Sequence, residues 1–203
     1  MTARNAPFKR LSLFETAWLE RLTVFPVHWF AIVWSVLLCL VAVVGWGAVS
    51  PLEGLALVVA GLIAWSLFEY AVHRYLFHMK SRWRVINWLV FVLHGNHHAQ
   101  PRDPLRNLMP PLLSVPIALC IWAAIIGVAG TAGTWAFMGF MIGYVIYDLV
   151  HYACHQWPMR RGVLRALKRH HMRHHYFDAD ANYAITGLHW DRVFGSRTDS
   201  LKR

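Results

Sequence analysis

Long apolar runs alternate with polar segments along the chain. Four runs stand out, covering about 27–49, 52–70 (reading on towards His78), 111–129 and 134–152. Each approaches the roughly 20 residues that a helix needs to cross a hydrocarbon core of about 30 Å. Backbone groups cannot stay unpaired in lipid, so spanning runs of this kind are helical. The pattern therefore predicts four transmembrane helices.

The turns between the runs predict how these helices pair. A short turn with Gly47, Ser50 and Pro51 joins the first run to the second, and a turn with Gly130 and Gly133 joins the third to the fourth. Neither turn carries Lys or Arg. All twenty basic residues lie in the N-terminal segment, the central segment and the C-terminal tail. The four helices should form two hairpins with their basic side in the cytoplasm.

The composition supports a membrane protein. Hydrophobic residues make up 57% of the chain and charged residues 15%, and eleven residues are Trp, which favours membrane interfaces. A buried bundle of a soluble protein is disfavoured because nothing polar covers the runs. A net charge of +10 would also suit a nucleic-acid partner. The runs instead place the basic residues at a membrane surface, and we expect no nucleic acid.

Two smaller features bear on the surroundings of the protein. Residues 1–26 are expected to form an N-terminal interfacial segment, since 8–25 have an amphipathic pattern. An ordinary solvated segment is an equal alternative there. The first 25 residues lack the apolar core of a cleavable signal peptide. The three cysteines, Cys39, Cys120 and Cys154, are interpreted as reduced thiols.

Histidines carry the candidate chemistry. The chain has thirteen, and most fall into four motifs, HRYLFH, HGNHH, HYACH and HMRHH. The motif histidines are His73, His78, His94, His97, His98, His151, His155, His171, His174 and His175. Spacings of three and four residues place side chains on one helix face, where neighbouring rings can converge on a metal. Neutral imidazole suits iron, zinc, copper or nickel.

The predicted topology brings the four motifs to one membrane face. HRYLFH and HYACH stand at the exits of the second and fourth runs, and the HGNHH and HMRHH motifs follow in the polar segments. One such motif alone would be weak evidence for a metal. Ten convergent imidazoles exceed the four to six ligands usual for one metal ion. We therefore predict two metal ions, each with about five histidines.

Scarce carboxylates near the motifs suggest supporting roles. Glu69 precedes His73 by four residues and Asp148 precedes His151 by three. Each is a candidate to accept the second ring N–H of a ligand, which fixes its orientation and raises its basicity. An ion pair with Arg74 is the alternative for Glu69.

Other polar residues near the motifs are more ambiguous. Asn182 is a candidate to orient a ligand or substrate, or to cap a loop. His189 is a candidate pocket residue near the motifs. His28 is expected at the membrane interface and His170 in solvent.

Five segments carry a family resemblance: FEYAVHRYLFH (68–78), LHGNHHAQPRDPLRNLMPP (93–111), GYVIYDLVHYACH (143–155), LKRHHMRHH (167–175) and GLHWDRVFG (187–195). The chain resembles the fatty acid hydroxylase superfamily over about 55–197, and is most similar to fatty acid 2-hydroxylases. The histidine spacing marks the superfamily. The PRDPLRNLMPP and YDLVHY stretches favour the 2-hydroxylase branch over sterol desaturase-like or carotene hydroxylase-like relatives.

The resemblance implies a function and its requirements. The ten motif histidines would be ligands of two metal ions, iron in the active enzyme, although the same ligands would also hold zinc. The enzyme would use O₂ and two electrons to hydroxylate the 2-position of a fatty acyl chain, free or in a sphingolipid. Larger family members carry a fused cytochrome b5 domain. Here the expected electron donor is a separate cytochrome b5-like or ferredoxin-like protein.

The expected fold is a single domain over 1–203. It is an all-α integral membrane fold of four transmembrane helices in two hairpins, with a cytoplasmic helical cap that holds the dimetal site. Two alternatives remain open. One is a sterol or sphingoid-base hydroxylase or desaturase of the same superfamily. The other is a non-enzymatic membrane metal-binding protein, although a transporter should place ionisable ligands near the bilayer midplane.

Overall fold

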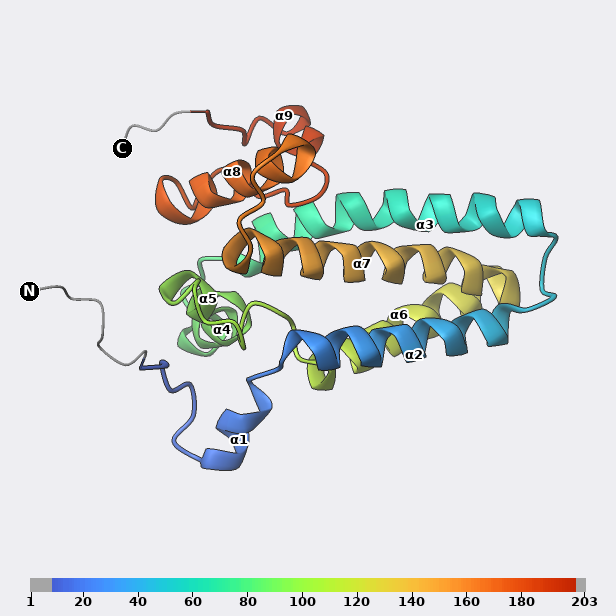
Figure 1. The fold of residues 1–203 in the computed structure, drawn as a ribbon. Coiled ribbons are helices and arrows are strands. Elements are labelled where there is room, and N and C mark those ends of the chain that lie inside the picture. Colours follow the sequence, from blue (N-terminus) through green and yellow to red (C-terminus); the bar gives the residue numbers. More distant parts are fainter. Residues whose placement is uncertain (1–8, 200–203) are drawn as a thin grey trace, which may run out of the picture.

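The computed structural model of the protein describes residues 9–199, and the regular elements within this range are helices (Figure 1). Four long helices run alongside one another: α2 (Val27–Gly45), α3 (Pro51–Ala71), α6 (Pro111–Ala129) and α7 (Gly133–Gln156). Three helical stretches are long and apolar enough to cross a membrane, Val27–Gly45, Pro51–Phe77 and Pro111–Gln156. The last contains α6, the short turn η3 (Gly130–Ala132) and α7. The prediction of a helical membrane protein is confirmed.

Helix α7 is the centre of the bundle, because it packs against α2, α3 and α6. Its contact with α3 is the most extensive, and two glycines permit it. A Cβ atom on Gly61 would overlap the carbonyl oxygen of Ala136, and one on Gly139 would overlap that of Val58. Small residues allow the backbones of membrane helices to approach closely. The α3–α7 pair therefore forms a fixed base for the residues at its polar end.

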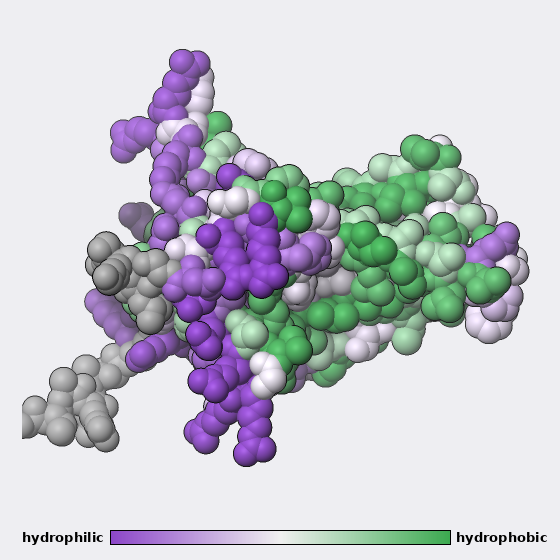
Figure 2. Space-filling model, turned by 90° about the horizontal axis from the view of Figure 1, so that it is seen from above, coloured by the Kyte–Doolittle hydropathy of each residue, from purple (hydrophilic) through white to green (hydrophobic). Residues whose placement is uncertain are grey.

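Short helices gather at one end of the bundle and form a cap (Figure 1). They are α1 (Ala17–Leu22), α4 (Arg84–Val90), α5 (Asn96–Ala99), α8 (Gly162–Tyr176) and α9 (His189–Val193). Figure 2 shows hydrophilic side chains concentrated at this end and hydrophobic side chains along the long helices. The polar cap and the apolar bundle are thus separate regions of the molecule.

Two stretches of π-helix lie between the bundle and the cap. They are η1 (Val72–Phe77), which continues α3, and η2 (Phe91–Gly95), which joins α4 to α5. The HRYLFH motif explains why η1 matters, since His73 and His78 are five residues apart. In an α-helix, five residues rotate the side chain about 140° away from its starting direction. A π-turn, with its i to i+5 repeat, returns the chain to the same side.

The N-terminal strap, defined here as residues 9–26, covers most of the amphipathic stretch 8–25, for which an interfacial and a solvated segment were equal alternatives. Its helix is confined to α1, and Phe8 lies outside the described residues. Glu20 accepts hydrogen bonds from the backbone N–H groups of Leu13 and Phe14, which stabilises a bend before the helix. The strap is fastened to the cap by an ion pair between Glu20 and Arg106.

Candidate metal centre

The structure brings all ten motif histidines together in two groups. Group one contains His73, His78, His94, His98 and His174, and group two contains His97, His151, His155, His171 and His175. Within each group the ring nitrogens lie within 4.8 Å of one another, an arrangement that could hold a metal ion. The groups are adjacent. His97 of group two is next to His98 of group one in the chain, and His175 of group two is next to His174 of group one.

Each HxxHH motif divides its histidines between the groups. On the second motif, His94 and His98 join group one while His97 joins group two. On α8, His171 and His175 join group two while His174 joins group one. Residues four apart share a helix face, and the residue between them points towards the neighbouring group. One short helix can therefore serve two centres.

Distances between ring nitrogens test whether a metal fits. In group one, the Nε2 atoms of His73 and His94 are 3.1 Å apart, and those of His94 and His98 are 3.0 Å apart. In group two, the separation between His151 and His97 is 2.8 Å. A metal–nitrogen bond of about 2.1 Å places adjacent octahedral ligands about 3.0 Å apart. The spacing of the described nitrogens therefore fits shared ligation.

Buried ring nitrogens without partners point to the same fit. Nε2 of His78 has no hydrogen-bond partner among residues 9–199, although it is buried. Burial lowers the pKa of His78 to about 4 and that of His98 to about 3. Burial, followed by the charge of neighbouring histidines, lowers the pKa of His171 well below its ordinary value. The rings are therefore neutral at pH 7, which is the form that ligates metals.

Backbone carbonyls orient two of the group-one rings. Nδ1 of His73 donates to the carbonyl of Tyr183 at 2.5 Å, and Nδ1 of His174 donates to the carbonyl of Ala181 at 2.7 Å. A donor bond at Nδ1 leaves Nε2 free to face the other rings of the group. The loop from Ala181 to Tyr183 thus fixes ring orientation through its backbone carbonyls, whereas the sequence had indicated only the side chain of Asn182 for such a role.

Glu69 has a different partner from the one expected. Its carboxylate accepts the backbone N–H groups of Ile185, Thr186 and Gly187 and the hydroxyl of Thr186. It therefore neither accepts the ring N–H of His73 nor pairs with Arg74. A loop with several unpaired N–H groups competes more strongly for a buried carboxylate than one ring does. Glu69 acts on the site by holding the loop that follows Tyr183.

The other supporting candidates also contact the backbone. Asp148 accepts the N–H of Met109 and the hydroxyl of Tyr144, both at 3.1 Å, rather than a ligand N–H. Asn182 is buried with a positive φ of 56°, and its amide exchanges two hydrogen bonds with the backbone of Thr198. It shapes a loop, as one of its two interpretations had it. His189 is exposed, packs on Trp190 and belongs to neither group.

The expectation that His170 faces solvent is wrong. His170 is buried, and its Nε2 lies 2.8 Å from Asp191. Asp191 also accepts the N–H groups of Tyr183 and Ala184 and the hydroxyl of Ser196. The ring therefore ties α8 to the loop that orients group one. The one carboxylate in GLHWDRVFG, Asp191, was the signal available in the sequence.

Asn107 was likewise missed. Its amide nitrogen lies 3.1 Å from Nδ1 of His97, and its amide oxygen accepts from Gln156. The residue thus links the segment before α6 to the end of α7, beside group two. Its place in PRDPLRNLMPP was the only hint that the sequence offered.

An apolar cavity of about 560 Å³ opens beside both groups. His94 of group one and His97 and His151 of group two line its polar end. Its walls come from the strap, α3 with η1, α4 with η2, α6 and α7. Away from the histidines it is lined by Trp65, Phe68, Leu113, Ile117, Ile121, Phe140 and Met141. A cavity of this kind suits a hydrocarbon chain whose polar end lies at the cap.

The sequence matches the family model described as fatty acid hydroxylase over residues 58–196. The chain belongs to the fatty acid hydroxylase family. The matched range contains all ten histidines of the two groups. The resemblance drawn from the motifs is thereby confirmed, and the family is one of metalloenzymes acting on lipids.

Several relatives refine this membership. The chain is 34% identical to the dihydroceramide fatty acyl 2-hydroxylase FAH2 of Arabidopsis thaliana, over 90% of this chain and 78% of that protein. It is 37% identical to the human fatty acid 2-hydroxylase, over 68% of this chain and 38% of the human protein. A solved structure of full-length scs7p, with only the hydroxylase domain visible, superposes with a TM-score of 0.83 at 29% identity. It covers 91% of this chain and 72% of that one.

Proposed function

We propose that this protein is a membrane-bound 2-hydroxylase of fatty acyl chains. The observation that carries the proposal is the placement of both histidine groups at the polar end of an apolar cavity. The relatives named as fatty acid 2-hydroxylases and dihydroceramide fatty acyl 2-hydroxylases support the choice of position. The acyl chain is free or carried by a sphingolipid or related lipid.

The ten histidines of the two groups are the proposed ligands of two metal ions, iron in the active enzyme. Bound metals would supply the activation of O₂, for which imidazole-rich sites are suited. Hydroxylation inserts one oxygen atom of O₂ into a C–H bond, and the other oxygen leaves as water after uptake of two electrons and two protons. The electrons come from a separate carrier protein.

The protein's own residues set the position of the reacting carbon. The apolar walls of the cavity hold the acyl tail and exclude water, so the polar end of the lipid remains at the cap. Ile121 and Phe140 line the part of the cavity within the bundle, whereas His94, His97 and His151 line the part at the cap. Carbon 2, next to the acyl carbonyl, then lies beside the histidines, while the rest of the acyl chain extends into the bundle.

The proposed topology has four membrane spans, with α6 and α7 as separate crossings and the whole chain as one domain. The absence of Lys and Arg from the turns at 46–50 and 130–132 supports placing the cap in the cytoplasm. An impermeant thiol reagent tests this orientation in intact cells. A cysteine introduced at Gly47 should be labelled from outside, and one introduced at Arg82 should be labelled only after lysis.

The function is tested by lipid analysis of cells that express the protein and by product formation from the purified, iron-loaded enzyme. We expect 2-hydroxyacyl species from the wild-type protein and none from His171→Ala. Hydroxylation of a sterol or a sphingoid base would instead identify a hydroxylase of that substrate. A new double bond in the product would identify a desaturase. Metal uptake without any oxygenated product would refute the proposed enzymatic function.

A further inference from the structure

Helix α8 has two opposite faces. Leu167, His170, His171 and His174 lie on one side of it and are buried. The other side carries Arg165, Lys168, Arg169, Met172 and Arg173, which recur at the i, i+3 and i+4 spacing of a single helix face. We call this second side the cationic face. It lies one helix diameter, about 10–12 Å, from the side that holds the histidines.

The cationic face surrounds a surface hollow of about 500 Å³ with an apolar floor. Met159, Met172 and Phe177 line the hollow, and Arg160, Arg165, Lys168, Arg169 and Arg173 border it. Of these cations, Arg160, Arg165 and Arg169 are exposed and form no ion pair within the described part of the chain. Unpaired positive charge around an apolar centre resembles the rim and core of a protein interface, where Met and Arg are enriched.

The floor of the hollow leads directly to group two. Met172 and Met159 pack against Ala153 and Cys154, which lie on α7 between His151 and His155. Lys168 stands three residues before His171 on α8 and donates to the carbonyl of Trp157, at the end of α7. A molecule bound to the cationic face is therefore separated from group two only by α8 and by the side chains of Met159 and Met172.

We propose that the cationic face of α8 docks the electron donor of the reaction, an acidic one-electron carrier protein. This rests on the proposed function, since only an oxygenase requires a reductant. Two reduced carriers are oxidised for each C–H bond hydroxylated and each O₂ consumed, with two protons taken up and one water released. The cations steer an acidic partner to the side of the cap nearest group two, where electrostatic attraction raises association rates by about 10- to 1000-fold.

The competing occupant of a basic surface near a membrane is anionic lipid. The apolar floor favours a protein partner, because lipid head groups bind cations without needing such a centre. The two are separated by the assay environment. Zwitterionic vesicles contain no anionic lipid, so a docking defect that persists in them belongs to the carrier.

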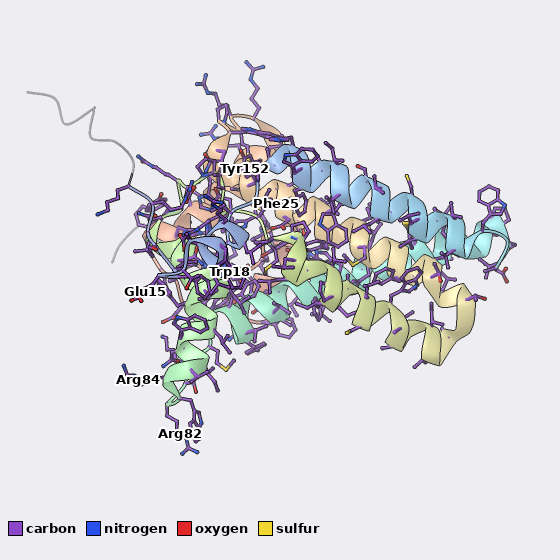
Figure 3. All side chains as sticks on the ribbon, turned by 90° about the horizontal axis from the view of Figure 1, so that it is seen from below. Glu15, Trp18, Phe25, Arg82, Arg84 and Tyr152 are labelled. Atoms are coloured by element: carbon purple, nitrogen blue, oxygen red, sulfur yellow. The ribbon has the colours of Figure 1, made fainter. Side chains whose placement is uncertain are left out.

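The test compares two double variants. One combines Arg165→Glu and Arg169→Glu on α8, and the control combines Arg82→Glu and Arg84→Glu. The control pair has the same charge change on exposed residues at the outer end of α4 (Figure 3). The iron-loaded enzymes in zwitterionic vesicles receive electrons either from dithionite or from a reduced acidic carrier. Two carriers are used in turn, a [2Fe–2S] ferredoxin and a soluble cytochrome b5 domain, and 2-hydroxyacyl product is quantified.

We expect the α8 variant to raise the KM for the effective carrier by about tenfold and to leave dithionite-driven turnover unchanged, with the control near wild type. Higher salt should weaken carrier-driven turnover in the wild type more than in the α8 variant. Equal KM values in the two variants would overturn the proposal, as would a defect seen only with anionic lipid. Failure of both carriers with an enzyme that works on dithionite would also overturn it. A wild type that makes no product even with dithionite refutes the proposed function itself.

Discussion

His97 and His98 are sequence neighbours that belong to different groups. This division makes the loss of a single ring informative, because it should affect one centre and leave the other's ligands in place. His171 is fully buried in group two, and its Nε2 lies 2.8 Å from that of His155. The two centres can therefore be separated by substitution.

His171→Ala should reduce bound metal from two ions per chain to one and lower activity by at least about 100-fold, since loss even of an outer partner of a metal ligand costs 10- to 100-fold. Elemental analysis of the iron-loaded protein and product assays measure both effects. His189→Ala is the matched control, because His189 is exposed and belongs to neither group. Equal metal loss in the two variants would contradict the assignment of His171.

Asp191→Asn should destabilise the cap by about 1–3 kcal/mol at neutral pH, because it weakens a buried acceptor of several hydrogen bonds. Burial raises the pKa of Asp191, but the hydrogen bonds from His170, Ser196 and Ala184 lower it by more. The net pKa is therefore below its ordinary value. A depressed pKa contributes stability above pH of about 4 that is lost as the pH falls through the folded pKa. Thermal unfolding should show the wild-type advantage at pH 7 and its decline in acid. A pH-independent difference would argue against the carboxylate charge.

The sequence allowed prediction of which histidines gather but not of what surrounds them. Regular spacing and common topology sufficed for the ten rings. Glu69 could not be assigned to the loop at 185–187, because its partners are backbone N–H groups with no signature of their own. His170 was misjudged for a related reason: its burial depends on Asp191, which lies twenty-one residues further along the chain.

At the scale of elements, the α3–α7 contact should be the most sensitive packing in the bundle. Gly139→Ala adds a Cβ atom against the backbone of Val58, and overpacking of this kind costs about 1–3 kcal/mol. The control is Gly127→Ala on α6, whose Cβ would meet nothing within 4 Å. Thermal unfolding in detergent should show a loss for the first variant and no loss for the second. Equal stability would mean that the two helices can separate without cost.

The strap should open in acid. Burial raises the pKa of Glu20, but hydrogen bonds from Phe14 and Leu13 and the charge of Arg106 lower it, giving a net pKa below the ordinary value. The clamp is therefore complete above pH of about 4.3 and is lost as the pH falls through the lowered pKa. The protection of the Leu13 and Phe14 amides, measured as the hydrogen-exchange rate relative to the intrinsic rate at each pH, should fall in that range. Glu20→Gln should exchange rapidly at neutral pH as well, and slow exchange in that variant would exclude the clamp.

The helix boundaries illustrate which elements a pattern can predict. The run at 111–129 matches α6, and the run at 52–70 falls within α3, where Ser50 and Glu53 form a capping box at the start. The amphipathic pattern over 8–25 did not indicate the length of α1, because such a pattern specifies a face only where a helix has formed. Here Glu20 bonds the chain ahead of α1 instead of extending the helix.

At the scale of the whole molecule, the two histidine groups connect the bundle to the cap, because each group joins a bundle helix, or its π-helical continuation, to helices of the cap. Their histidines come from η1 and the residue that follows it, from η2 and α5, from α7 and from α8, whereas α2, α3 and α6 contribute none. Removing metal with a chelator should therefore increase amide hydrogen exchange in α8 and α5 while α2 and α6 remain protected. Restoring iron should reverse the change. Uniform exchange over all helices would show that metal does not connect the two regions.

The π-helical turn at η1 has a consequence for the recognition and engineering of such sites. A π-turn holds one residue more than an α-helical turn, so histidines five residues apart can share a face. Deleting one residue between His73 and His78 would restore an α-helical register but shorten the path from α3 to η2. Searches that require a spacing of four would overlook this ligand pair, and grafting the site onto an uninterrupted α-helix would leave one ring facing outward.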